Sequence, residues 1–168
     1  YLKSADSIWI VSNINRAVND KTAKDMLDHN FRQQLLMDGA YGSLVFVATQ
    51  SDVLQRSEVQ QSLQLPRHTS LAECAQARND FTKQRIQTDF IDGLVEMGRA
   101  SGDVVDRAEL QKKFQLPVFC VSSLDHQKLS GVRNNDGPAL VWSDEADTQV
   151  PALRKHVHRA TLARRALT

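Results

Sequence analysis

The sequence predicts an α/β domain built on a small parallel sheet, and two patterns carry that prediction. Three short runs, residues 8–11, 44–48 and 118–121, are continuously apolar and rich in β-branched and aromatic residues. Such runs are typical of parallel strands that are covered by helices on both faces. The segments between them have helical periodicity, so strands and helices alternate along the chain as they do in open α/β sheets.

Helical periodicity fills both crossovers between the strands. The first crossover begins with a good N-cap pair at residues 19–20 and stops at Gly39. The second contains a proline-free stretch that predicts a long helix over about residues 70–97, ended by Gly98 and Gly102. Apolar residues of the first crossover recur at spacings of three and four, namely Ala23, Met26, Leu27, Phe31 and Leu35.

The remaining segments predict two further helices and a long loop. A short helix is expected over residues 106–114, and a last amphipathic helix begins near Pro151, a residue suited to a first helical turn. Residues 130–149 are expected to form a loop that carries a short extra strand at 139–142. Three principal strands are few for a sheet covered on both faces, so flanking strands are either missing or supplied by another chain.

Composition fits a single globular domain. The 168 residues include 41% hydrophobic and 24% charged residues, as in ordinary soluble proteins. The charges of the 21 basic and 20 acidic residues nearly cancel, so the protein has no overall electrostatic field that would favour binding to nucleic acid or to a membrane. The start of the chain has no signal-peptide pattern, and the apolar runs are too short to cross a bilayer. We therefore expect an intracellular protein, either cytoplasmic or nuclear.

No metal site or catalytic constellation is predicted. Cys74 and Cys120 lie far apart without ligands at short spacing, so free, buried thiols are expected. The terminal basic helix, residues 150–168, has no aromatic residues interleaved with its charges, which favours a solvated face over base stacking. Four of the five histidines are expected to be solvated rather than metal ligands, namely His68, His126, His156 and His158.

Polar residues follow each predicted strand. In open parallel sheets ligands bind beyond the carboxyl ends of the strands, so these residues are the candidates for a site. The first run is followed by Ser12 and Asn13. The polar residues after the second and third runs are Thr49, Gln50, Ser51 and Asp52, then Ser122 and Ser123.

A buried strand ending in Thr49-x-x-Asp52, followed by a later strand ending in Ser122-Ser123, resembles the guanine-recognition pair of GTPases. Further blocks at residues 5–11, 16–23 and 147–153 are similar to dynamin-like large GTPases. The likeness is greatest to fungal P-loop proteins similar to the nuclear GTPase of germinal-centre B cells, and it covers roughly residues 5–160. It implies the C-terminal half of a three-layer P-loop-NTPase-like parallel sheet, a truncated sheet that lacks the N-terminal P-loop and switch strands.

The resemblance implies a role for each of these polar residues. The carboxylate of Asp52 would accept both the N1–H and the amino group of guanine, a pair of donors that adenine lacks. Backbone N–H groups near Ser122 and Ser123 would approach the guanine O6, with Thr49 and Gln50 completing the base site. The alternative for Asp52 is an ordinary turn or helix-capping acid.

Two departures from the family pattern bear on activity. Gln50 stands where the family has a lysine, so the loss of a charge should weaken nucleotide binding by about 1 kcal/mol or more. No Gly-x-x-x-x-Gly-Lys-Ser/Thr or Asp-x-x-Gly motif occurs in the chain. GTP or GDP binding is therefore expected to be weak or absent here, and Mg²⁺ binding and GTP hydrolysis are expected only in a full-length parent.

Two functions from different classes remain open. The chain is either a piece of a dynamin-like GTPase domain, inactive alone, or a non-enzymatic binding and assembly module that kept the fold. A truncated sheet leaves an open edge that invites strand pairing, so a homodimer is expected in either case.

Overall fold

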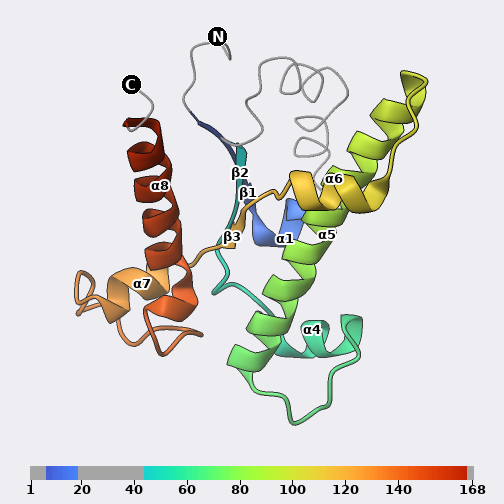
Figure 1. The fold of residues 1–168 in the computed structure, drawn as a ribbon. Helices are drawn as coiled ribbons and strands as arrows, with labels where there is room; N and C mark the ends of the chain where they lie inside the picture. Colours follow the sequence, from blue (N-terminus) through green and yellow to red (C-terminus); the bar gives the residue numbers. More distant parts are fainter. Residues whose placement is uncertain (1–6, 19–43, 166–168) are drawn as a thin grey trace. The chain divides into compact units, whose positions relative to one another are not determined.

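The computed structural model describes residues 7–18 and 44–165, in which strands and helices alternate (Figure 1). The helix predicted between residues 19 and 39 lies outside these ranges. The described elements in chain order are β1 (Ile8–Asn13), α1 (Ile14–Ala17), β2 (Leu44–Thr49), α4 (Arg56–Ser62), α5 (Leu71–Ala100), α6 (Arg107–Lys113), β3 (Val118–Cys120), α7 (Ser123–Leu129), the 3-10 helix η3 (Ala146–Thr148) and α8 (Val150–Arg165).

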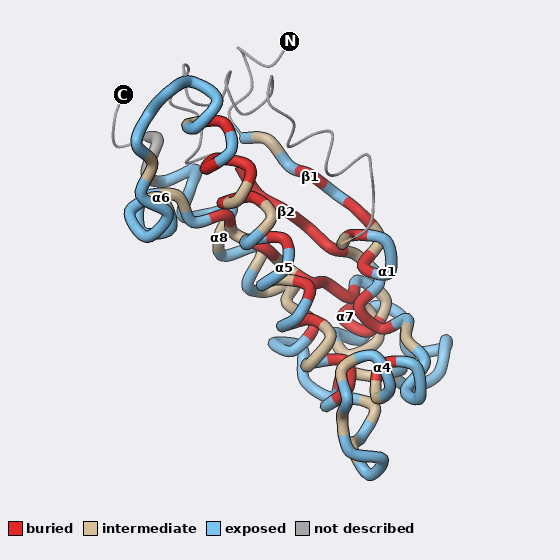
Figure 2. The backbone as a smooth tube through the Cα atoms, turned by 90° about the vertical axis from the view of Figure 1, so that its right-hand side faces the viewer, coloured by how far each residue is buried: buried red, intermediate tan, exposed pale blue. Residues whose placement is uncertain are grey.

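The three strands form one small parallel sheet in the order β1-β2-β3, which confirms the α/β class. The central strand β2 is buried from Leu44 to Ala48, as its continuous apolar run predicts, and Figure 2 shows this run as buried backbone. Pairing toward β3 begins where the N–H of Phe46 donates to the carbonyl of Pro117 at 2.9 Å. The three principal predicted strands are all present.

The prediction that the first strand is buried on both faces is wrong. Ile10 and Ser12 are buried, whereas Trp9 is 41% exposed and Val11 is 60% exposed. This alternation is typical of a strand with one covered face. β1 stands at the end of the strand order, and a run of four apolar residues does not reveal whether a strand is central or at an edge.

The chain divides into two compact units. The first unit comprises residues 1–47 and 82–118, and the second comprises residues 48–81 and 119–168. In the first unit, the part of α5 after residue 82 presents a buried apolar stripe: Ile86, Phe90, Ile91, Leu94, Val95 and Met97. The spacings of three and four in this stripe are those of a helix with one buried face.

α5 begins with a capping box, which accounts for its well-defined start. The N–H of Ser70 donates to Glu73 Oε2 at 2.7 Å, and the N–H of Glu73 donates to Ser70 Oγ at 3.2 Å. The two residues thereby satisfy each other's backbone donors. The bond from the backbone N–H of Ser70, followed by the effect of the Ser70 hydroxyl, holds the pKa of the Glu73 carboxyl below its ordinary value.

α5 does not end at Gly98, as the sequence predicts, but continues to Ala100. A Cβ at position 98 would overlap the side chain of Val105, so glycine at this position makes room for a close contact rather than stopping the helix. The turn comes later, at Gly102, whose φ of +82° is readily adopted only by glycine.

The two shorter predicted helices are confirmed. α6 begins after Asp106, whose carboxylate accepts the N–H of Ala108 at 2.8 Å, and it ends before Phe114. α8 begins at Val150, one residue before Pro151. α4 and α7 were not predicted.

Candidate functional site

The candidate site is a turn in the second unit, directly after β2. Gln50 has a φ of +61°, an unusual conformation for a residue other than glycine, and the N–H of Val53 donates to its carbonyl at 3.0 Å. Ser51 is fully buried and Asp52 is 8% exposed. The N–H of Ser51 donates to the carbonyl of Val121 at 3.1 Å, which ties the turn to the residue after β3.

Asp52 and Ser122 meet directly. The hydroxyl of Ser122 donates to Asp52 Oδ1 at 2.6 Å, although the two residues are 70 positions apart in the sequence. The oxygen of the same hydroxyl accepts the N–H of Asp125 at 3.1 Å, as the N-cap of α7. Its proton is therefore directed at Asp52.

Asp52 does not cap a helix, because the N-cap position of α4 is Gln55. Thr49 is the half-buried last residue of β2, and Gln50 is exposed. Ser123 is the exposed first residue of α7. The predicted site residues thus divide into a buried pair, Asp52 and Ser122, and more accessible neighbours in the chain.

Arg78 of α5 holds the turn from a second side. Its Nη1 donates to the carbonyl of Val53 and its Nη2 donates to the carbonyl of Ser51, each at 2.7 Å. Burial lowers the pKa of this guanidinium, and the nearby acidic groups of Cys120 and Asp52 oppose that shift. Sequence reasoning missed Arg78, although its spacing of four residues from buried Cys74 places both on one face of the helix.

Asp125 is a buried carboxylate that sequence reasoning missed. It is fully buried in α7, and its carboxylate accepts three successive backbone N–H groups. The donors are Leu140 at 2.6 Å, Val141 at 2.8 Å and Trp142 at 3.0 Å. The predicted extra strand at 139–142 is therefore wrong, because these N–H groups bond to a side chain instead of a neighbouring strand.

Trp142 links this segment to the turn. Its side chain is 4% exposed, and its Nε1–H donates to Ser51 Oγ at 3.3 Å. The segment before α8 is tied to the end of β3 as well. The N–H of Ser122 donates to the carbonyl of Thr148 at 3.1 Å, and the N–H of Cys120 donates to Gln149 Oε1 at 3.0 Å.

The polar residues predicted to follow the first strand are the last two residues of β1, in the first unit. Asn13 is the N-cap of α1, and its side-chain oxygen accepts the N–H of Asn15 at 2.9 Å. Ser12 is buried. The structure therefore gives Asn13 a capping role that its position at a strand end does not reveal.

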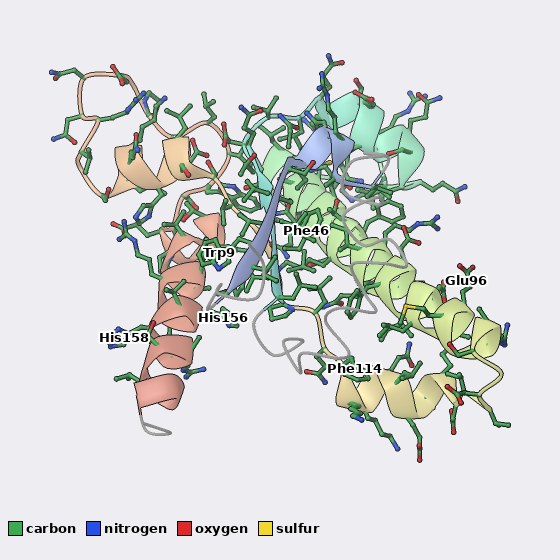
Figure 3. The ribbon with its side chains drawn as sticks, turned by 90° about the horizontal axis from the view of Figure 1, so that it is seen from above. Trp9, Phe46, Glu96, Phe114, His156 and His158 are labelled. Atoms are coloured by element: carbon green, nitrogen blue, oxygen red, sulfur yellow. The ribbon has the colours of Figure 1, made fainter. Side chains whose placement is uncertain are left out.

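Of the four histidines expected to be solvated, His126 is buried and contradicts the expectation, whereas His156 is half-buried. His126 is 6% exposed, with its Nδ1 3.8 Å from Glu145 Oε2. His156 packs against the ring of Phe119, with a centroid distance of 5.4 Å. His68 and His158 are exposed. Figure 3 shows His156 and His158 on different sides of α8, as their spacing of two residues requires.

Cys74 and Cys120 are free and buried, as predicted. Within residues 7–18 and 44–165, no group of three or more His, Cys, Asp or Glu side chains is arranged to hold a metal ion. No helix in the same ranges is both long and apolar enough to cross a membrane. Comparisons of the chain with protein-family models, curated proteins and solved structures gave no significant match.

Proposed function

We propose that this chain is the base-recognising part of a dynamin-like guanine-nucleotide-binding domain with a three-layer P-loop-NTPase-like sheet. The observation that supports the proposal most is the hydrogen bond of 2.6 Å from Ser122 to Asp52. It joins the two motifs that carry the resemblance, at the carboxyl ends of two neighbouring strands. In open parallel sheets this is where ligands bind.

The chemistry of Asp52 suits a base with two adjacent donors. An ionised carboxylate has about four lone-pair positions. One is taken by Ser122, and in this proposal two of the others accept the N1–H and the amino group of guanine. Adenine presents no such pair of donors, so the same carboxylate discriminates between the two bases.

In this proposal the chain binds the base but does not hydrolyse GTP alone. The sequence has no phosphate-binding loop, so the phosphates and Mg²⁺ would be held by segments of a longer parent protein. Gln50 replaces the family's lysine, which lowers the expected affinity by about 1 kcal/mol. An intracellular location, cytoplasmic or nuclear, belongs to the same proposal.

The test is calorimetric titration of the chain with GDP and with ADP. We expect GDP to bind with a Kd tighter than about 100 μM and ADP to bind at least about tenfold more weakly. Asp52→Ala should abolish GDP binding. Asp136→Asn, a change of an exposed aspartate in the same unit, is the matched control and should leave it intact.

Asp52→Asn sharpens the test because it exchanges an acceptor for a donor. Xanthine carries a carbonyl where guanine carries its amino group, so this variant should favour xanthosine diphosphate over GDP. Equal binding of GDP and ADP, or no GDP binding at millimolar concentration, would overturn the proposal.

A second candidate function is a non-enzymatic assembly module, favoured by the exposed apolar side of β1. Trp9 and Val11 are 41% and 60% exposed, and the strand has no charged residue, proline or glycine to discourage pairing. In this reading the chain forms a homodimer through β1. Light scattering should then show a dimer that Val11→Lys converts to a monomer. A monomeric wild type excludes this candidate.

A further inference from the structure

We infer that Asp125 is a positioning residue for base recognition, which acts through Trp142 on the turn that carries Asp52. The inference rests on the proposed function. Its basis is a chain of hydrogen bonds that runs from α7 through residues 140–142 to Ser51, entirely within the second unit.

The first step is the fixed position of Asp125 itself. Its own N–H is bonded to Ser122 Oγ at 3.1 Å, in the first turn of α7, and its side chain is fully buried. A carboxylate held in this way presents its two oxygens in one defined direction. Because hydrogen bonds to a charged acceptor are strong, its three bonds to backbone N–H groups define the path of the Leu140–Trp142 backbone.

The second step is the placement of Trp142. The bond from its backbone N–H to Asp125 Oδ2 sets where the indole begins, and the indole Nε1–H then donates to Ser51 Oγ. Ser51 immediately precedes Asp52 and is also held by Val121 and Arg78. The indole is thus one of three supports for the residue beside the base-reading carboxylate.

The third step separates two influences of Asp125 on Asp52. Its backbone N–H orients the hydroxyl of Ser122 toward Asp52, whereas its carboxylate acts through Trp142 and Ser51. Asp125→Asn keeps the backbone N–H and nearly the same side-chain shape, so it alters only the second influence. A purely structural role for Asp125 would affect stability without changing the preference for guanine over adenine.

The test uses the full chain with Trp9→Phe, which leaves Trp142 as the sole tryptophan. GDP and ADP affinities are measured by calorimetry, and the emission of Trp142 is recorded during the same titrations. In this background we expect Asp125→Asn to shift the Trp142 emission to longer wavelength. We also expect it to weaken GDP binding about tenfold while ADP binding changes little. Asp136→Asn should behave like the background protein in all three readouts.

Each outcome decides between the hypotheses. If the Trp9→Phe protein binds no GDP, the proposed function fails and the inference fails with it. If that protein binds GDP and a folded Asp125→Asn variant keeps the same GDP affinity and base preference, the inference alone is overturned.

Trp142→Phe covers the case in which Asp125→Asn does not fold. It keeps an aromatic ring in the buried site but removes the N–H that donates to Ser51. With folding verified by circular dichroism, GDP affinity should fall about threefold or more while ADP binding changes little. Unchanged GDP affinity in this variant would overturn the inference.

Discussion

The two compact units are stabilised by different kinds of interaction. Of the 22 buried hydrophobic residues among those described, 15 belong to the first unit, where α5 presents its apolar stripe. Of the nine buried polar or charged residues, all but Ser12 and Thr82 belong to the second unit. Hydrophobic burial has no preferred direction, whereas hydrogen bonds orient the groups they join. The candidate site lies in the second unit, where hydrogen bonds fix the orientation of the buried polar side chains.

The polar interior of the second unit is only partly satisfied. In the described ranges, buried polar atoms without a hydrogen-bond partner occur at Arg78 Nε, both amide atoms of Asn79, and His126 Nδ1. All of them are in the second unit. A buried polar group without a partner destabilises a fold by about 1–3 kcal/mol. The comparison therefore predicts that the first unit contributes more stability and the second unit more specificity.

Phe46→Ala tests the apolar unit and should have the largest effect. Phe46 is 1% exposed in β2, so its truncation should lower the free energy of unfolding by about 3–5 kcal/mol. Urea unfolding followed by circular dichroism measures the change. Phe81→Ala, in a residue that is 47% exposed, is the control and should cost less than about 1 kcal/mol. Equal losses of unfolding free energy in Phe46→Ala and Phe81→Ala would contradict the prediction that apolar burial in the first unit contributes most of the stability.

Asp125→Ala tests the polar unit. It leaves three backbone N–H groups without their charged acceptor, so we expect a loss of about 3 kcal/mol. Hydrogen exchange at residues 140–142 should accelerate in the same variant. Asp136→Ala removes only an exposed ion pair to Arg133 and should stay within about 0.5 kcal/mol of wild type. If Asp125→Ala lowered the free energy of unfolding as little as Asp136→Ala, the hydrogen bonds of Asp125 would not be important for the stability of the second unit.

Ser70→Ala should have a smaller effect, because it removes one side of the capping box of α5. Loss of an N-cap hydroxyl costs about 1 kcal/mol, which the same urea experiment can resolve. Ser70 also lies in the second unit. The stability loss of Ser70→Ala can therefore be compared with that of Asp125→Ala, to set one local polar contact beside the longer chain of hydrogen bonds around Asp125.

Glu73→Gln adds a pH dependence to this measurement. The pKa of Glu73 is lowered in the folded chain by its hydrogen bonds to Ser70. The contribution of the Glu73 carboxylate to stability is therefore fully present above the unfolded pKa of about 4.3, and it is lost as pH falls through the lower folded pKa. The stability difference between wild type and Glu73→Gln should be clear at pH 7 and shrink below about pH 4. A difference that is independent of pH would rule out this role.

Gly98→Ala should change the stability least, and whether it raises or lowers Tm should depend on the side chain at position 105. Alanine favours a helix by about 1 kcal/mol over glycine, but its Cβ would collide with the Val105 side chain. We expect the single variant to lower Tm slightly. In a Val105→Ala background the same change should raise Tm, and failure of the sign to reverse would show that this contact is unimportant.

Elements with a long or continuous apolar pattern were predictable from the sequence. β2 is the buried central strand of the sheet and is continuously apolar, and the stripe of α5 extends over several turns. Short helices were predictable only in part: α6 was predicted, whereas α4 and α7, which also contain seven residues each, were missed. The exposed side of β1 was missed because its four apolar residues look the same at an edge as in the centre of a sheet.

By itself, the sequence determined the α/β alternation and the places where polar residues follow the strands, including Asp52 and Ser122. Both depend on local patterns, since the period of apolar residues decides between helix and strand. Only the tertiary structure decided that Asp52 meets Ser122, and that Arg78, Asp125 and Trp142 support the same turn. A hydrogen bond requires its donor and acceptor to lie within about 3.5 Å, and for residues far apart in the chain that closeness is set by how the elements pack.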